Sequence, residues 1–323
     1  MAVPMRISLG IKKSLSLFVC LGILACTCYG SAADDDLLRG LLWKDFLSLG
    51  SRRPKIAVVL GGGGARGLSH IGVLKILKEK NIPVDIIVGT SAGALVGGLY
   101  AAGIDIGELE RIGVTTGWNN LSNLSKFRML GLVTRESLLS TQKLEKYIQD
   151  RIGRKRFSDL NIPFACVACD IKTGERIVFK EGELAFAMRA SATIPGVFEP
   201  AEYRHRYLVD GGVVDNMPVD IARIMGADFI IAVYPKAENS SFEVSSVFTT
   251  LVQVINIQGK LLAESQIKDA DYVIIPNVRD VNIVELNRSE ECIEAGIVAG
   301  RQTAAALQDK ILEKYIKDIA EKR

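Results

Sequence analysis

Short apolar runs alternate with helical patterns between residues 55 and 102. Lys55–Leu60 and Ile86–Val88 are β-branched or apolar runs of strand length. The segment 68–80 repeats apolar residues at helical spacing, and 92–102 is small and apolar throughout. Strands and helices that alternate in this way predict a parallel sheet with helices on both faces.

The remainder of the chain continues this alternation. Further strands are expected at Phe164–Asp170, Arg176–Phe179, Tyr207–Val209, Phe229–Tyr234 and Tyr272–Ile275, and further helices at 141–152, 183–191, 219–225 and 290–322. The first two of these strands are close enough in sequence to form a hairpin. We therefore predict an α/β fold, a three-layer α/β/α domain with a mainly parallel central sheet that spans residues 55–323.

The N-terminal segment has a different pattern. Arg6, Lys12 and Lys13 precede an apolar run over 15–25, and small residues then lead into three aspartates. This order predicts a signal peptide over residues 1–32.

Two other interpretations of this segment stay open. The apolar run is a candidate for a retained membrane anchor. The sequence Ile23-Leu-Ala-Cys26 is similar to a bacterial lipobox, which would make the protein a lipoprotein modified at Cys26. We expect an exported protein, either periplasmic or membrane-associated. Residues 33–54 are expected to form an amphipathic segment that packs on the domain or touches a bilayer surface.

Composition limits the partners and the metal chemistry. The 323 residues are 48% hydrophobic and 24% charged, with a net charge of +3. So small a charge, without a dense basic tract, gives no reason to expect a nucleic-acid partner. Cys166 and Cys169 have the spacing of a metal or redox pair, but they lie in a predicted strand that points them to opposite faces. We therefore expect buried free thiols.

A candidate nucleophile lies between the second strand and the helix that follows it. Gly89-Thr-Ser-Ala-Gly93 has the Gly-x-Ser-x-Gly pattern of a nucleophile elbow. Gly89 and Gly93 permit a sharp turn that presents the hydroxyl of Ser91 at a helix N-terminus. Ser91 is therefore the first candidate catalytic residue.

A glycine-rich loop follows the first strand and opens the first helix. Its bare N–H groups and the helix dipole suit either a phosphate or an oxyanion. A dinucleotide fold would also place an acidic residue near the end of the second strand, where this chain has Ser91. The loop therefore predicts an oxyanion hole formed by Gly62, Gly63, Gly64, Ala65, Arg66 and Gly67.

The base that activates Ser91 has three candidates. His70 lies in an apolar helix and has the pattern of a packing residue, and His205 lies between two arginines in a solvated setting. Asp210 ends a strand and is followed by two glycines, which leave room for another backbone to approach. The shortage of histidine favours a carboxylate that acts directly.

Three motifs in this order resemble the patatin-like phospholipase family. They are Gly62-x-Gly64-x-Arg66-Gly67, Gly89-x-Ser91-x-Gly93 and Asp210-Gly-Gly212, supported by 189–200 and 210–219. The resemblance covers roughly 56–275 and is greatest to bacterial members akin to neuropathy target esterase.

The resemblance implies a Ser91–Asp210 dyad in which Asp210 is the proton acceptor. It also implies an oxyanion hole at 62–67, and hydrolysis of phospholipid or lysophospholipid esters through an acyl-enzyme, without a metal or cofactor. The expected partners are the lipid substrate and a membrane surface, and the expected role is lipid catabolism. The alternatives are an esterase or thioesterase on soluble acyl esters and a non-catalytic binding module. An apolar segment over 118–132 is a candidate rim for acyl chains, with packing in the core as the alternative.

Overall fold

The computed structural model describes residues 32–50, 53–116, 140–236, 245, 247–278 and 280–321. The chain divides into two compact units, Met1–Arg53 and Pro54–Arg323. The predicted signal peptide and the predicted apolar rim at 118–132 lie outside the described residues, apart from Ala32.

The first unit contains one described helix, α2 (Ala32–Ser48). The segment expected to be amphipathic is therefore helical over this range. The rings of Trp43 and Phe46 stack on one another with their centroids 5.1 Å apart.

The second unit is built on one eight-stranded sheet with the order β5-β6-β3-β2-β1-β7-β8, and β4 pairs with β3. The strands are β1 (Ile56–Leu60), β2 (Ile86–Thr90), β3 (Phe164–Asp170), β4 (Arg176–Phe179), β5 (Ala201–Tyr203), β6 (Arg206–Asp210), β7 (Phe229–Val233) and β8 (Tyr272–Ile274). β1 pairs in parallel with β2 and β7, as do β2 with β3 and β7 with β8. The pairings of β3 with β4 and β6, and of β5 with β6, are antiparallel. The mainly parallel sheet and the predicted hairpin are confirmed.

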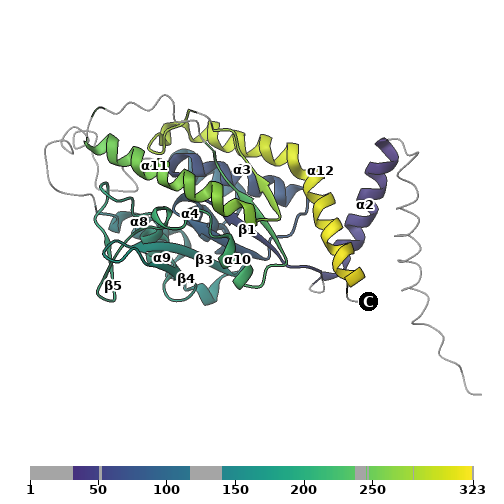
Figure 1. Ribbon diagram of the computed structural model, residues 1–323, viewed down its shortest axis with the longest axis horizontal. Helices are drawn as coiled ribbons and strands as arrows, with labels where there is room; N and C mark the ends of the chain where they lie inside the picture. The colour runs from purple at the N-terminus through teal and green to yellow at the C-terminus, as the bar shows by residue number, and fades with distance from the viewer. Residues whose placement is uncertain are drawn as a thin grey trace, which may run out of the picture. The chain divides into compact units, whose positions relative to one another are not determined.

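Helices cover both faces of the sheet (Figure 1). α4 (Ala92–Ala101) packs on the face that presents Leu60 and Ile87, where the small residue Gly97 allows close approach. α10 (Val219–Ile224) packs on the opposite face, in a core shared with Val59 and Val88. α3 (Ser69–Glu79) packs against α4 and against the long α12 (Ser289–Glu321). The three-layer α/β/α prediction is therefore confirmed.

The other α-helices are α5 (Ile106–Thr115), α8 (Gln142–Ile152), α9 (Leu184–Ser191) and α11 (Val247–Gln266). Short 3-10 turns occur at η2 (Gly64–Leu68), η3 (Phe157–Asp159), η4 (Gly211–Val213), η6 (Ile267–Asp269) and η7 (Leu286–Arg288). The sequence interpretation did not predict α5, α11 or β5, and it treated all of 61–67 as a loop.

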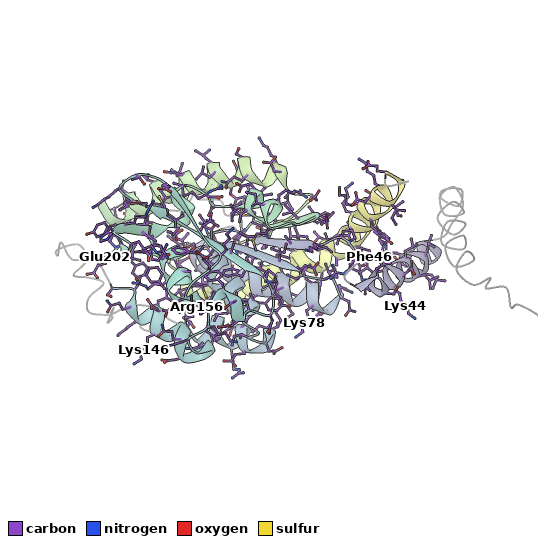
Figure 2. All side chains as sticks on the ribbon, turned by 90° about the horizontal axis from the view of Figure 1, so that it is seen from below. Lys44, Phe46, Lys78, Lys146, Arg156 and Glu202 are labelled. Carbon is purple, nitrogen blue, oxygen red and sulfur yellow. The ribbon has the colours of Figure 1, made fainter. Side chains whose placement is uncertain are left out.

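The surface and the interior of the described chain differ sharply in charge. Figure 2 shows charged side chains that extend from the surface, among them Lys78, Lys146, Arg156 and Glu202. In contrast, each of the strands β1, β2 and β7 has all five of its residues buried. Cys166, Cys169 and Cys292 are buried and free, as predicted for the first two. Among the described helices, none has the length and apolarity that a membrane-spanning helix needs.

Candidate active site

Ser91 lies at a strained turn between β2 and α4. Its backbone has φ 55° and ψ −121°, a conformation that costs free energy for a residue with a side chain. Gly93 makes the turn possible, because a Cβ there would overlap the carbonyl oxygen of Leu60. The N–H of Ser91 donates to the hydroxyl of Ser191 over 3.0 Å, and that hydroxyl donates to the carbonyl of Val167 over 2.6 Å. The elbow is therefore tied to the central strand β3.

β2 and β6 pair with the same edge of β3. The carbonyl of Pro163 accepts from β2, and the N–H of Ile171 donates to β6. The N–H of Asp170 instead donates into the turn before β4. Because alternate residues of a strand direct their backbone groups to opposite edges, the contacts at 163 and 171 share one edge.

The sheet register brings the candidate nucleophile and carboxylate together. β2 is parallel to β3 and ends with Thr90 opposite Val167. β6 is antiparallel to β3 and ends with Asp210 opposite Ala168. The two strands thus approach end to end along β3, so that Asp210 meets the elbow immediately after Thr90.

Asp210 is a buried carboxylate with a raised pKa. Only 6% of the residue is exposed. Burial raises its pKa to about 6, although hydrogen bonds from the Ser91 side chain and the Gly212 N–H favour the charged form. The Gly212 N–H lies 2.8 Å from Oδ1 and fixes the carboxylate. Asp210 is therefore positioned and poised to accept a proton from Ser91 near neutral pH.

The two histidines are not arranged as bases for Ser91. His70 is fully buried, and its Nε2 lies 2.8 Å from the carbonyl oxygen of Gly61. Burial lowers the pKa of His70 to about 4, so the ring is neutral at pH 7 and its Nε2–H donates to that carbonyl. His205 is exposed at the β5–β6 turn with φ 65°. The packing role expected of His70 and the solvated setting expected of His205 are both confirmed.

The glycine loop has fewer available donors than the sequence suggested. The Gly62 N–H donates to Oδ1 of Asn216 over 3.1 Å, and the Ala65 N–H donates to the carbonyl of Ile283 over 2.8 Å. The Arg66 N–H donates to the carbonyl of Gly63 over 3.2 Å.

In the part of the chain that the structure describes, no acceptor takes the N–H groups of Gly63 and Gly64, and both residues line the cleft beside Ser91. We therefore correct the predicted donor set of 62–67. Gly62, Ala65 and Arg66 use their N–H groups to hold the loop. The absence of a side chain at Gly67 serves packing, because a Cβ there would overlap the Cβ of Ala92.

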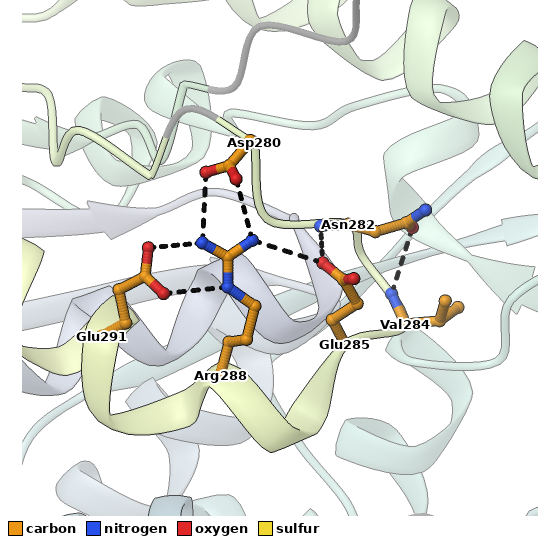
Figure 3. A network of polar contacts seen from close by, with 6 residues as sticks. All are labelled: Asp280, Asn282, Val284, Glu285, Arg288 and Glu291. Atoms are coloured by element: carbon orange, nitrogen blue, oxygen red, sulfur yellow. Dashed lines mark hydrogen bonds and ion pairs between the residues drawn. The ribbon is translucent and has the colours of Figure 1, made fainter. Parts of the chain in front are cut away.

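The segment between β8 and η7 supports the glycine loop. Arg288 pairs with both carboxylate oxygens of Asp280 at 3.1 and 3.2 Å, and with those of Glu291 at 2.6 and 2.8 Å (Figure 3). The segment that Arg288 fixes contains Ile283, the acceptor for Ala65. Gly64 has φ +56°, and a Cβ there would overlap the Ile283 carbonyl oxygen. The two loops are therefore in direct backbone contact.

Two site residues were not singled out from the sequence. Ser191 holds the elbow, as described above. Asn216 joins three parts of the cleft, because its Oδ1 accepts from Gly62 and its Nδ2 donates to the carbonyl of Gly259 on α11 over 3.0 Å. The available signal was the position of Asn216 inside the 210–219 motif. That motif supported the resemblance, but the sequence interpretation gave Asn216 no role.

An apolar pocket leads away from Ser91. It is lined by residues of α4, α5, α8 and the neighbouring turns, among them Ala92, Leu95, Val96, Leu99, Leu109, Ile112, Leu144, Ile148, Ile194 and Phe198. Ser91 also lines a second, polar cleft, together with Asp210, Asn216 and residues of α11. Ser91 thus stands between an apolar pocket and a polar cleft.

Similarity to known proteins supports the same site region. Residues 58–223 match the family described as patatin-like phospholipase. An uncharacterized NTE family protein of Mycobacterium tuberculosis is 37% identical over 186 residues, which cover 57% of this chain and 50% of that protein. Human patatin-like phospholipase domain-containing protein 6 is 38% identical over 180 residues, 55% of this chain and 13% of that protein.

A yeast protein and a solved structure are also similar to this chain. Lysophospholipase NTE1 of Saccharomyces cerevisiae is 36% identical over 184 residues, 55% of this chain and 10% of that protein. Among solved structures, VipD from Legionella pneumophila aligns with a TM-score of 0.47 at 16% identity, over 81% of this chain and 67% of VipD. The chain matches about half the length of the mycobacterial relative. On the family match, which includes the glycine loop, the elbow and Asp210, the chain belongs to the patatin-like phospholipase family.

Proposed function

We propose that this protein is a serine acyl hydrolase that cleaves carboxylic ester bonds of phospholipids or lysophospholipids. The observation that carries the proposal is the position of Ser91. It lies at a strained elbow, beside the buried carboxylate of Asp210 and at the opening of an apolar pocket. Yeast NTE1, which is similar to this chain over 184 residues, is named a lysophospholipase.

The proposed reaction has two halves. Asp210 removes the proton of the Ser91 hydroxyl while Oγ of Ser91 attacks the ester carbonyl carbon. The N–H groups of Gly63 and Gly64 stabilise the negative oxygen of the tetrahedral intermediate. The bond to the alcohol breaks, Asp210 returns the proton to that leaving oxygen, and the acyl group stays on Ser91. Asp210 then deprotonates a water that attacks the acyl group, and Ser91 leaves with the proton.

The pKa of Asp210 suits this role. An aspartate with an ordinary pKa near 4 is a weak base, whereas a value of about 6 gives a stronger base that is still mostly ionised at pH 7. The apolar pocket supplies a place for the acyl chain, because most of its lining residues are apolar. The pKa suits ester hydrolysis in general, and the pocket favours an ester with a long acyl chain.

We also propose that the substrate is taken from a lipid surface. Leu251, Val254, Ile257 and Leu261 are 38–63% exposed along the outer face of α11, which lies at the surface of the fold in Figure 1. The inner face of the same helix lines the cleft with Asn256 and Lys260. A helix that is apolar on its exposed face needs an apolar partner, and a lipid surface there would lie beside the cleft.

Hydrolysis rates measured on phospholipid vesicles and on a soluble short ester distinguish a role of α11 in surface binding from a general loss of folded enzyme. Val254→Ser with Leu261→Ser is expected to lower activity on vesicles severalfold and to leave the soluble ester unaffected. Ile224→Ser, on the exposed surface of α10, is the matched control. Equal loss on both substrates would contradict a surface role for α11.

Export remains a proposal that rests on the pattern of residues 1–32. Mass spectrometry of the mature protein distinguishes a cleaved N-terminus, a lipid on Cys26 and a retained segment. An unprocessed chain recovered from the cytoplasm would contradict it.

Labelling and product analysis test the function itself. A fluorophosphonate probe is expected to label Ser91, and Ser91→Ala is expected to abolish both labelling and fatty-acid release from lysophospholipid. Labelling with release only from short soluble esters would favour an esterase or thioesterase. A folded protein that is neither labelled nor active would favour a binding module.

A further inference from the structure

The polar cleft beside Ser91 contains two cationic side chains from different elements. Arg66 comes from η2, and Lys260 comes from α11. Both line the cleft with Ser91 and Asp210. The proposed hydrolysis uses neither of them.

Arg66 is a buried cation without a carboxylate partner in the described part of the chain. Only 8% of the residue is exposed. Its Nε donates to the carbonyl of Gly63 over 3.3 Å, and its Nη2 donates to Oδ1 of Asn256 over 2.5 Å. Both acceptors are neutral, and a guanidinium has five N–H donors, so three remain without an acceptor among the described residues.

Desolvation of this cation is only partly offset within the described chain. Burial lowers the pKa of Arg66 to about 10, a direction that reports the cost of keeping its charge there. A buried charge is ordinarily paired with an opposite charge. Gly63 and Asn256 hold the guanidinium of Arg66 in place. Its three other N–H groups can then donate to a group that enters the cleft.

We propose that Arg66 and Lys260 bind an anionic phosphate of the ester substrate, and so select acyl esters that carry a phosphate over neutral ones. A planar guanidinium binds phosphate oxygens in pairs, and a lysine adds a second positive charge. The acyl chain would then occupy the apolar pocket, and the phosphate would occupy the opposite side of Ser91. This inference rests on the proposed function, because it specifies the substrate of the same site.

The kinetic test compares two soluble substrates that differ only in phosphate, 1-hexanoylglycerol 3-phosphate and 1-hexanoylglycerol. The ratio of their kcat/KM values is expected to favour the phosphate ester in the wild type. Lys260→Gln and Arg66→Gln are each expected to lower this ratio about tenfold or more, chiefly through KM for the phosphate ester. Lys268→Gln, an exposed lysine just beyond α11, is the control and should keep the ratio.

Equal losses on both esters would overturn the proposal, because Arg66 would then only support the loop or the oxyanion. A wild-type ratio near one would overturn it as well.

A binding measurement keeps the test independent of turnover. Calorimetry with 1-hexylglycerol 3-phosphate, an ether that cannot be hydrolysed, is expected to show tighter binding than 1-hexylglycerol, and Lys260→Gln should remove the difference. If this binding is found but neither ester is hydrolysed, the proposed function fails and the anion site stands. Inorganic phosphate that binds as tightly as the ether phosphate would overturn the assignment to a substrate, since the site would then hold free phosphate.

Discussion

Asp210 has a pKa of about 6 because burial outweighs the hydrogen bonds that it accepts from Ser91 and Gly212. In the proposed mechanism, only the carboxylate form of Asp210 can accept the proton of Ser91. We therefore expect kcat/KM on a soluble ester to rise tenfold per pH unit below about pH 6 and to level off above it. Asp210→Asn should lower kcat on the order of 10²–10⁴-fold. A pH profile that Asp210→Asn leaves unchanged, at near-normal rate, would exclude Asp210 as the base.

The same carboxylate is expected to destabilise the folded protein at neutral pH. Its pKa is 3.8 ordinarily and about 6 when folded, so the folded state binds the proton more tightly. The free energy of unfolding therefore falls as the pH rises from about 4 to 6. The asparagine in the Asp210→Asn variant does not titrate, so the free energy of unfolding of the variant does not decrease in this way. Above pH 6 the variant should be more stable than the wild type by on the order of 3 kcal/mol.

Urea unfolding of both proteins between pH 4 and 8 measures this effect. The difference should shrink toward zero at pH 4, where the wild-type carboxyl is protonated in the folded state. The lowered pKa of His70, about 4, makes the free energy of unfolding decrease as the pH falls in the same range. Both proteins contain His70, so this contribution cancels in the difference between them. An asparagine variant that is less stable at pH 8 would contradict the assigned pKa.

Gly63 offers the cleaner test of the oxyanion hole. Gly64→Val would disrupt the loop, because φ is +56° and a Cβ would overlap the carbonyl of Ile283. At Gly63 a Cβ would lie 3.2 Å from the Cγ of Pro235, which requires only a small adjustment. The branched side chain of Gly63→Val should obstruct the N–H donors and cost on the order of 10²–10³ in kcat. Normal turnover in a variant with unchanged circular dichroism would exclude this donor.

At the scale of elements, the segment fixed by Arg288 is expected to determine how rigid the glycine loop is. Arg288→Ala removes four hydrogen bonds to Asp280 and Glu291, so Ile283 should hold Ala65 less firmly. We expect faster amide hydrogen exchange at Ala65 and a severalfold lower kcat, with little change in KM.

Lys310→Ala, which removes an exposed ion pair with Glu313 farther along α12, is the matched control. It should leave exchange and kcat unchanged. If Arg288→Ala alters neither exchange at Ala65 nor kcat, the segment does not support the oxyanion donors.

The elements that the sequence predicted are those with a local pattern. β1, β2 and α3 were recognised because apolar runs and helical spacing are visible within each segment. α11 was missed because its first half is rich in valine, isoleucine and threonine, which favour strands over helices. Ser91 was found because its turn depends on adjacent glycines. Asn216 and Ile283 were not, since their roles depend on contacts with segments about 150 and 220 residues away.

At the scale of the whole molecule, the site is produced by the topology of the sheet. The parallel β2 and the antiparallel β6 end against each other on β3, which places Ser91 beside Asp210. Helices on the α4 side of the sheet enclose an apolar pocket, while α11 and the glycine loop enclose a charged cleft. This separation suits an amphiphilic ester, whose chain and polar group extend in different directions from the bond that is cleaved.

The length of the apolar pocket should set the preferred acyl chain. Leu99 lines it eight residues beyond Ser91 on α4, about 12 Å farther along the helix axis. Leu99→Trp should fill the distal end, lowering kcat/KM at least tenfold for a 16-carbon acyl ester and leaving a four-carbon ester nearly unchanged. Ile224→Trp makes a similar increase in volume at an exposed position of α10 and is the control. Equal loss on both esters in Leu99→Trp, with unchanged thermal stability, would show that acyl chains do not occupy this pocket.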